Sequence, residues 1–273
     1  MQQDMVARRG LVLLGCGKMG SALLEGWLAQ GLPPASVWVL EPHPSDWLKG
    51  LAAQGLHLGG DLPPDPAVVL IAVKPQMMGR ALPQMAGYGN GSTLVVTIAA
   101  GTRIAAYEAL LGADTPVVRA MPNTPAAVGR GITAICGNAR VTGDQMALAE
   151  SLLSAVGQVV RLEGEHQMDA VTAVSGSGPA YVFHMIEALA EAGVAQGLAP
   201  DLAMRLARAT VTGAGELAHR AAESAGQLRV NVTSPGGTTA AALAVLMDAD
   251  TGLPPLMRRA VQAAADRGRE LGA

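Results

Sequence analysis

Aromatic residues, cysteines and charges are all scarce in this chain of 273 residues. Only 3% of the residues are aromatic although 50% are hydrophobic, so the core must be built from alanine, leucine, valine and methionine. The two cysteines, Cys16 and Cys136, are far apart in the sequence and do not indicate a disulfide framework. The five histidines are scattered without the spacing of metal ligands, so we expect no metal site.

Long apolar runs and a strong net charge are also missing. The uncharged apolar stretches are all shorter than a membrane-spanning helix requires. The first ten residues are polar, and glycine interrupts the apolar run after them too early for a signal peptide. A net charge of −3 provides no basic surface for nucleic acid or for a membrane. We therefore expect a cytoplasmic protein whose ligands are small molecules.

Glycine is abundant, with 34 residues, and two glycine-rich segments carry most of the functional information. The first segment follows an apolar run at residues 11–14 that is typical of a buried parallel strand. It reads GCGKMG over residues 15–20 and leads into an expected helix over residues 21–30. A G-x-G-x-x-G sequence between a strand and a helix is the fingerprint of a dinucleotide-binding fold.

Each glycine of this fingerprint has its own expected role. Gly15 permits the tight turn, Gly17 lets the pyrophosphate approach the backbone, and Gly20 lets the helix pack closely against the strand. The alternative interpretation is a glycine turn that occurs by chance. The context of a strand before the segment and a helix after it favours the nucleotide-binding interpretation.

The acidic residue Glu41 bears on the choice of cofactor. It ends an expected strand over residues 37–40, close to where an acidic ligand of the ribose is expected. A carboxylate there can accept hydrogen bonds from both ribose hydroxyls of NADH, and it repels the 2′-phosphate of NADPH. His43 can become protonated and partly offset that repulsion, and the two prolines of the turn leave the direction of Glu41 open. The sequence therefore favours NADH over NADPH.

The second glycine-rich segment, SPGGTT at residues 234–239, precedes an alanine-rich run at residues 240–247. Alanine and leucine are strong helix formers, so the run predicts a helix with Thr238 or Thr239 as its N-cap. Unpaired N–H groups and the positive end of the helix dipole at such a start favour a small carboxylate. The two hydroxyls can also hydrogen-bond a neighbouring polar atom. An ordinary capped loop is the alternative interpretation.

The pattern along the chain predicts two domains. Strands and helices alternate up to about residue 160, and only helices are expected after residue 164. Further buried strands are expected at residues 68–73, 93–98, 117–121 and 132–135. The expected helices cover residues 168–174, a long stretch to 196, and residues 200–222, 239–247 and 254–271, with a break at 175–179. We predict an α/β, Rossmann-type, doubly wound domain over residues 1–163 and an all-α domain over residues 164–273.

The expected helices after residue 164 carry broad apolar faces. Examples are Val182, Met185, Ile186, Leu189 and Val194. Roughly a hundred residues of alanine-rich helix, with almost no large aromatics, would expose too much apolar surface alone. We therefore expect a homodimer formed through the helical domain, or a larger assembly of such dimers.

Five blocks, taken in order, resemble the Δ1-pyrroline-5-carboxylate reductase family along essentially the whole chain. The blocks are GCGKMG at 15–20, AVKP at 72–75, RAMPNTP at 119–125, SGSGPAY at 175–181 and SPGGTT at 234–239. The first two occur in other dehydrogenases, whereas the last three in this order are close to diagnostic. The resemblance implies NAD(P)H-dependent reduction of a cyclic imine to L-proline, the last step of proline synthesis. It also implies a helical C-terminal domain that interlocks with that of a partner.

The resemblance also assigns individual residues. It places the hydroxyl of Thr239 opposite the imine nitrogen as the catalytic group, and it matches Thr238 to the cradle of the substrate carboxylate. The substrate-binding residues are then Glu165, Val232, Gly236, Gly237, Thr238 and Thr239. The fingerprint, the strand ends and the resemblance together give the cofactor-binding residues Leu14, Gly15, Cys16, Gly17, Lys18, Met19, Gly20, Glu41, Ala72, Val73, Lys74, Pro75, Ala100 and Asn231.

Simpler interpretations exist for several of these blocks. Glu165 can be an ordinary acidic residue at a helix N-terminus, and Lys74 can be a surface lysine at a strand end. A structural role is favoured for Arg119 and Asn123, which can organise the loop over the cofactor. The two serines of SGSGPAY can cap the following helix. The chain also departs from the family at residues 228–230, which read LRV where Leu-Lys-Asp is usual, and this leaves local details open.

Two other functions are alternatives to the reductase. A different two-domain NAD(P)-dependent reductase, such as a 3-hydroxyacid dehydrogenase, uses a catalytic lysine on a helix of the second domain. The lysines of this chain are Lys18, Lys49 and Lys74, all of them in the first domain, which argues against that class. A nucleotide-sensing protein without turnover is disfavoured by the intact threonine segment.

Overall fold

The computed structural model describes residues 2–272, which fall into two compact units. The first unit holds the chain up to Gly176 together with the segment from Ala265 onward, and the second holds residues 177–264. The first contains the sheet, and the second contains only helices. The expected α/β fold with an all-α C-terminal region is confirmed. The domain boundary near residue 164 stays a prediction.

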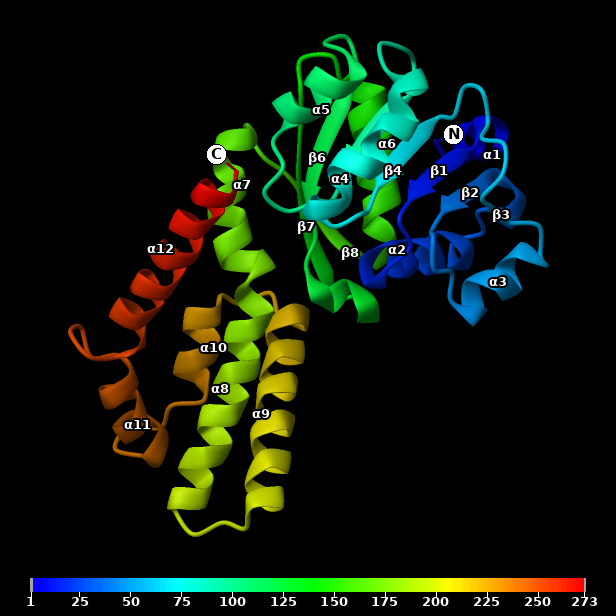
Figure 1. The fold of residues 1–273 in the computed structure, drawn as a ribbon. Helices are drawn as coiled ribbons and strands as arrows, with labels where there is room; N and C mark the ends of the chain where they lie inside the picture. Colours follow the sequence, from blue (N-terminus) through cyan, green and yellow to red (C-terminus); the bar gives the residue numbers. More distant parts are fainter. Residues whose placement is uncertain (1, 273) are drawn as a thin grey trace. The chain divides into compact units, whose positions relative to one another are not determined.

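An eight-stranded sheet organises the first unit (Figure 1). Its strand order is β3-β2-β1-β4-β5-β6-β7-β8, and only the β6–β7 pair is antiparallel. The order changes direction between β1 and β4, which is the switch point where doubly wound sheets bind nucleotides. The strands are β1 (Leu11–Leu14), β2 (Val37–Leu40), β3 (His57–Leu58), β4 (Val68–Ile71), β5 (Leu94–Thr97), β6 (Val117–Met121), β7 (Gly131–Gly137) and β8 (Gly157–Arg161).

Both faces of the central strands are buried, which explains their uninterrupted apolar sequences. On β1, Leu11 and Leu13 belong to one hydrophobic cluster, while Val12 and Leu14 belong to the other. The first cluster includes side chains of α1 (Gln2–Arg9), α2 (Lys18–Ala29), α3 (Asp46–Ala52) and α6 (Gly143–Leu153). The second includes side chains of α4 (Met78–Ala81) and α5 (Ile104–Leu111).

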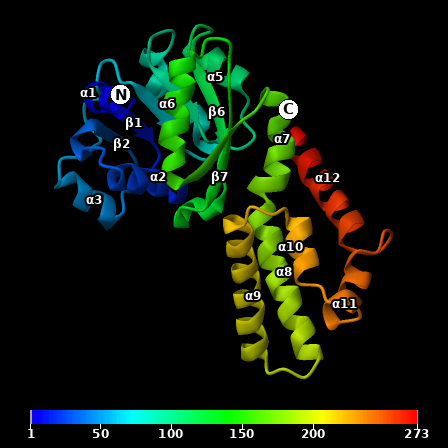
Figure 2. The same cartoon turned by 180° about the vertical axis from the view of Figure 1, so that it is seen from behind.

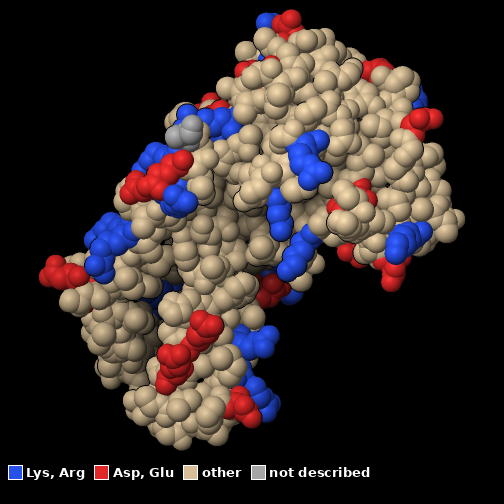
Figure 3. Space-filling model, viewed as in Figure 1, with Lys and Arg blue, Asp and Glu red and all other residues tan. Residues whose placement is uncertain are grey.

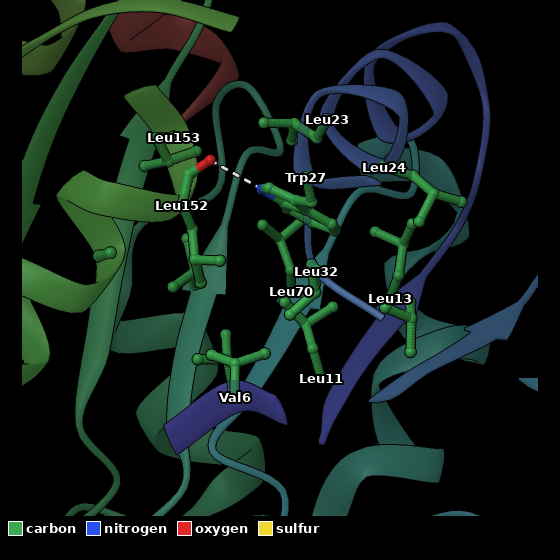
Figure 4. Close-up of a cluster of buried hydrophobic side chains, with 14 of the residues drawn as sticks. Val6, Leu11, Leu13, Leu23, Leu24, Trp27, Leu32, Leu70, Leu152 and Leu153 are labelled. Carbon is green, nitrogen blue, oxygen red and sulfur yellow. Dashed lines mark hydrogen bonds between the residues drawn. The ribbon is translucent and has the colours of Figure 1, made fainter. Parts of the chain in front are cut away.

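Trp27 fixes α2, the helix that follows the glycine fingerprint, within the first cluster (Figure 4). Its side chain is buried, and its indole Nε1 donates a hydrogen bond of 2.8 Å to the carbonyl oxygen of Leu152 near the end of α6. The polar atom of this large side chain is therefore satisfied without contact with water. The N-terminus of α2 is consequently carried by a rigid element of the core.

The second unit consists of helices with very little core of their own. Two long helices, α8 and α9, lie side by side in both views (Figures 1 and 2). The buried cluster between them contains Ala190, Ala203 and Ala207, with Ile186 packed against it. The helices that enter this unit are α8 (Gly178–Ala195), α9 (Pro200–Arg220), α10 (Ala225–Asn231), α11 (Thr238–Leu246) and α12 (Leu253–Leu271), the last of which continues into the first unit.

The expected break at residues 175–179 is narrower than predicted. After α7 (Met168–Val171) the chain continues as a π-helical turn, Thr172–Gly176, and only Ser177 lies outside a helix before α8. A Cβ at Gly176 would come within 2.8 Å of Met121 Cε, the end of a flexible side chain. Helix α2 also begins earlier than expected, at Lys18 rather than residue 21. No helix within residues 2–272 combines the length and the apolar character needed to cross a bilayer.

Candidate active site

The glycine fingerprint forms a tight connection between β1 and α2. Gly15 has a φ of +91° and donates its N–H to the carbonyl oxygen of Leu40 at 2.9 Å. A Cβ at Gly15 would lie 2.9 Å from Val73 Cγ1, and one at Gly20 would lie 2.5 Å from the carbonyl oxygen of Gly15. Both glycines are therefore required by backbone conformation or by packing. This agrees with the roles expected of the first and third glycines.

The middle glycine of the fingerprint faces open space instead. No atom lies within 4 Å of the position that a Cβ at Gly17 would occupy. Gly17 is the N-cap of α2, and no side chain caps this end of the helix. The first N–H groups of α2 and the positive end of its dipole are thus available to an anion. An open, uncapped helix start beside a tight turn fits the pyrophosphate of a dinucleotide.

Glu41 points toward the glycine loop and not away from it. Its Oε2 accepts the backbone N–H of Cys16 at 2.9 Å, and its Oε1 accepts the N–H of His43 at 3.0 Å. No ion pair to Glu41 is formed within residues 2–272. Burial, and secondarily the charge of Glu41, raises the pKa of the Cys16 thiol to about 11. The thiol is therefore neutral near pH 7.

The other candidates for the cofactor lie on both units. Leu14 ends β1 and accepts the N–H of Ala72 at 2.8 Å. Ala72, Val73, Lys74 and Pro75 follow β4, the neighbour of β1, and Ala100 follows β5, so all end at the same edge of the sheet. Asn231 belongs to the second unit, at the end of α10, where its Oδ1 accepts the amide Nε2 of Gln227 at 2.7 Å.

The threonine segment opens α11, but its N-cap differs from the expected one. Gly237 is the N-cap, and α11 begins at Thr238. Gly236 has a φ of +69°, which lets the N–H of Gly237 turn back to the carbonyl oxygen of Ser234 at 3.0 Å. The helix therefore starts one or two residues earlier than the alanine-rich run alone indicated.

This earlier start leaves the segment rich in unused donors. Thr238, Thr239 and Ala240 occupy the first turn of α11, where backbone N–H groups have no partner inside the helix. Among the described residues, neither threonine hydroxyl has a hydrogen-bond partner. Val232, on the approach to this loop, is 63% exposed. The segment can thus offer N–H groups to a carboxylate and a hydroxyl to a second polar atom.

Glu165 is held by a buried arginine of the sheet. Its Oε1 accepts a hydrogen bond of 2.7 Å from Arg119 Nη1 and one of 2.8 Å from the N–H of Ile104. Nearby, the hydroxyls of Tyr107 and Thr97 are 2.5 Å apart, and burial raises the pKa of the tyrosine. The sequence did not identify Tyr107 or Thr97. The only feature of the sequence that could have drawn attention to Tyr107 is the rarity of tyrosine, since the chain contains three tyrosines.

Asn123 has the structural role that the sequence favoured. Its Nδ2 donates to the carbonyl oxygen of Ser175 at 3.1 Å, and its Oδ1 accepts the N–H of Ile132 at 3.0 Å. The expected capping by the two serines holds only for the position of Ser177. Ser175 Oγ donates backward to the carbonyl oxygen of Val171, and Ser177 is the N-cap of α8 without a side-chain hydrogen bond. No group of three or more His, Cys, Asp or Glu side chains within residues 2–272 is placed to hold a metal ion.

A doubly wound sheet with this glycine turn, followed by a helical region, defines the class of two-domain nicotinamide-nucleotide oxidoreductases. Residues 10–101 match the family model described as NADP oxidoreductase coenzyme F420-dependent. Residues 165–271 match the model described as pyrroline-5-carboxylate reductase dimerisation. The chain belongs to the pyrroline-5-carboxylate reductase family, as its relatives show.

Three relatives illustrate this membership. The pyrroline-5-carboxylate reductase of Synechocystis is 43% identical over 266 residues, which cover 96% of this chain and 98% of the relative. A solved pyrroline-5-carboxylate reductase from Coxiella burnetii is 36% identical with a TM-score of 0.90, covering 97% of this chain and 99% of that one. The Plasmodium falciparum pyrroline carboxylate reductase, solved with NADP bound, is 30% identical with a TM-score of 0.79 and covers 97% and 98%.

Proposed function

We propose that this chain reduces Δ1-pyrroline-5-carboxylate to L-proline, the final step of proline biosynthesis, with a reduced nicotinamide cofactor. The threonine segment carries this proposal. It combines an uncapped helix start with two free hydroxyls, in a family member whose first unit has a nucleotide-binding turn. A small ring with one carboxylate and one protonated imine nitrogen matches N–H groups that donate and a hydroxyl oxygen that accepts. Its cytoplasmic location stays a prediction.

The first unit is proposed to hold the cofactor, which supplies the hydride. Gly17 and the first turn of α2 receive the pyrophosphate, and Glu41 faces the adenosine ribose. The loops after β4 and β5 line the nicotinamide side of the same sheet edge. The complete proposed set is Leu14, Gly15, Cys16, Gly17, Lys18, Met19, Gly20, Glu41, Ala72, Val73, Lys74, Pro75 and Ala100, with Asn231 from the second unit.

The threonine segment is proposed to orient the substrate. Gly236, Gly237 and Thr238 form the cradle of the carboxylate, since this is where free N–H groups and the helix dipole coincide. The hydroxyl of Thr239 hydrogen-bonds the imine nitrogen and so fixes the face of the ring that is reduced. No histidine acid is needed, because a simple pyrroline nitrogen can already be protonated near neutral pH. The resemblance adds Val232 and Glu165 as further substrate contacts.

NADH is the proposed preferred cofactor. The carboxylate of Glu41 is turned toward the glycine loop, and no lysine or arginine forms an ion pair with it within residues 2–272. A 2′-phosphate near this carboxylate would meet a like charge, whereas free ribose hydroxyls would find an acceptor. The Plasmodium relative was solved with NADP, so the preference of this chain needs its own measurement.

A homodimer formed through the helical region is proposed as the working unit. Only three alanines and Ile186 make up the core of the second unit. Several of its large apolar side chains are more than half exposed, among them Phe183, Leu217, Val232 and Val245. On the face drawn in Figure 3, acidic and basic groups are interspersed with broad areas that carry neither charge. Burial of these side chains against a second copy removes apolar surface from water. A larger assembly of dimers would bury more apolar surface in the same way.

Replacement of the catalytic hydroxyl tests the proposed function. The wild type is expected to oxidise NADH or NADPH when pyrroline-5-carboxylate is added, followed by loss of reduced-nicotinamide absorbance. Thr239→Ala is expected to lower kcat by about 10²–10³, the usual cost of removing one preorganised hydrogen-bonding group. Thr239→Ser should recover much of the rate, because it keeps the hydroxyl. Thr212→Ala on α9 is the matched control, and near wild-type turnover by Thr239→Ala would exclude the assigned role.

A further inference from the structure

A largely buried polar cluster lies near the carboxyl ends of β5 and β6, and of its members only Glu165 has a task in the proposed chemistry. The Arg119 side chain is only 6% exposed, and it pairs with Glu165, which is 29% exposed. Tyr107 and Thr97, both fully buried, are hydrogen-bonded to each other in the same region. All of these groups belong to the first unit. The cluster therefore lies in the unit that carries the nucleotide-binding turn.

The cluster brackets one loop, the segment from Ile98 to Arg103 that joins β5 to α5. At the start of the loop, Thr97 Oγ1 accepts the N–H of Ala99 at 3.3 Å. At its end, Glu165 Oε1 accepts the N–H of Ile104, the first residue of α5, at 2.8 Å. Between these two points lies Ala100, the proposed cofactor contact. The backbone on either side of that contact is thus fixed by hydrogen bonds.

The energetics favour a positioning role over a purely stabilising one. A buried guanidinium–carboxylate pair loses hydration, and replacing it with apolar residues is often neutral or stabilising. Here the carboxylate oxygen accepts from Arg119 and from the backbone of Ile104 together. Arg119 therefore sets where Oε1 lies, and Oε1 sets where α5 and its preceding loop begin. The ion pair therefore fixes the position of the β5–α5 loop, and the position of this loop affects how the proposed cofactor is held.

We propose that Arg119 and Glu165 are positioning residues that hold the β5–α5 loop in the conformation that receives the nicotinamide cofactor. The inference rests on the proposed function, in which Ala100 contacts the cofactor. It also differs from a direct contact of Glu165 with the substrate. Oε1 is occupied by Arg119 and Ile104, whereas Oε2 makes no hydrogen bond to any residue that the structure describes. Positioning of the loop therefore depends on Oε1 of Glu165, whereas a contact with the substrate would depend on Oε2.

Two substitutions at Glu165 separate these roles. Glu165→Ala removes both oxygens, and we expect it to raise the Kd for NADH of the full chain about tenfold and to slow hydride transfer by a similar factor. Glu165→Gln keeps one carbonyl oxygen able to accept from Arg119 and Ile104, so NADH binding should recover to within about twofold of wild type. Glu163→Gln, on an exposed neighbour, is the matched control and should change neither value.

The measurements are the Kd for NADH by fluorescence titration, the KM for each substrate, single-turnover hydride transfer and Tm. A Glu165→Ala enzyme with unchanged NADH affinity but a strongly raised KM for pyrroline-5-carboxylate would assign Glu165 to the substrate and overturn the positioning role. A Glu165→Ala enzyme with a lower Tm and an unchanged Kd for NADH would show that the pair is only structural.

A second variant keeps the test decisive where Glu165→Ala fails to fold. Arg119→Lys retains the charge but loses the fixed geometry of the guanidinium, so it should raise the Kd for NADH in the same direction. An unchanged Kd in that variant would overturn the inference. Failure of the proposed function is recognised separately, as a wild type that binds NADH but does not turn over pyrroline-5-carboxylate. The titrations with NADH remain informative in that case.

Discussion

The glycine fingerprint allows folding and cofactor binding to be separated by two substitutions. Gly20→Ala places a Cβ 2.5 Å from the carbonyl oxygen of Gly15, where ordinary contacts begin at 3.4 Å. Backbone must therefore move, and the β1–α2 turn is strained. Gly17→Ser places its Cβ where nothing lies within 4 Å, at the N-cap of α2, where serine is a favoured residue. The first change should damage the fold, and the second should damage only the ligand site.

The magnitudes follow from these contacts. Overpacking costs about 1–3 kcal/mol, and a rigid backbone oxygen favours the upper end of that range. Alanine regains up to about 1 kcal/mol of helix propensity in α2, so Gly20→Ala should lose about 2 kcal/mol of unfolding free energy. For a chain of this size that corresponds to a fall in Tm of about 4–8 °C. Gly17→Ser should leave the Tm of the cofactor-free protein unchanged or slightly higher.

Thermal unfolding with and without NADH measures both effects. A ligand at 100 times its Kd stabilises the wild type by about 2.7 kcal/mol, and Gly17→Ser should lose most of this shift. Gly50→Ala, at an exposed position in α3 with nothing within 4 Å of a Cβ, is the control: it should raise the Tm slightly through helix propensity and keep the wild-type shift with NADH. An NADH shift of wild-type size in Gly17→Ser would refute the placement of the pyrophosphate at this helix start. An unchanged Tm in Gly20→Ala would refute the packing argument.

Three further predictions concern cofactor choice, thiol reactivity and assembly. Glu41→Ser should shift the ratio of kcat/KM values from NADH toward NADPH, and an unchanged ratio would show that Glu41 does not select the cofactor. A pKa of about 11 for Cys16, against its ordinary 9.0, makes its thiolate about 100-fold rarer at pH 8, so its alkylation by iodoacetamide should be slower by that factor and accelerate as the pH rises toward 11. Labelling as fast as that of an unstructured cysteine peptide would contradict this. Light scattering at micromolar concentration should give an even multiple of 27.7 kDa, and the mass of a single chain would contradict the proposed dimer.

The elements that the sequence predicted well are those with a strong local signal. β1, β2 and β6 have the expected bounds, since each is an apolar run between turn residues. β3 contains only two residues, and β8 is a mostly exposed strand of mixed composition, so neither gives a clear periodic pattern. The nearly continuous helix through residues 175–179 has a different cause. Glycine and serine commonly end helices, but here the chain passes through them as a π-helical turn that leaves only Ser177 outside a helix.

The site could be predicted only where one segment contains the whole signal. The fingerprint and the threonine segment are contiguous, so residue types and spacing alone predict a ligand site at each, and the roles of their residues stay predictions. The pairing of Arg119 with Glu165 spans 46 residues and depends on how β6 and the start of the helical region are placed by the fold. The direction of Glu41 likewise depends on the turn after β2 and on the N–H of Cys16. Neither fact is encoded by local propensity.

The exposure of α11 connects the proposed dimer with the proposed catalytic role of Thr239. This helix carries both threonines, yet none of its residues is buried, and Val245 and Leu246 are 71% and 51% exposed. Donors that stabilise a reacting group are effective only when the surrounding packing holds them still and excludes water. A helix without buried residues cannot supply that packing from its own chain. The catalytic role proposed for Thr239 therefore requires that another surface cover α11, and in the proposed dimer the second copy would provide one.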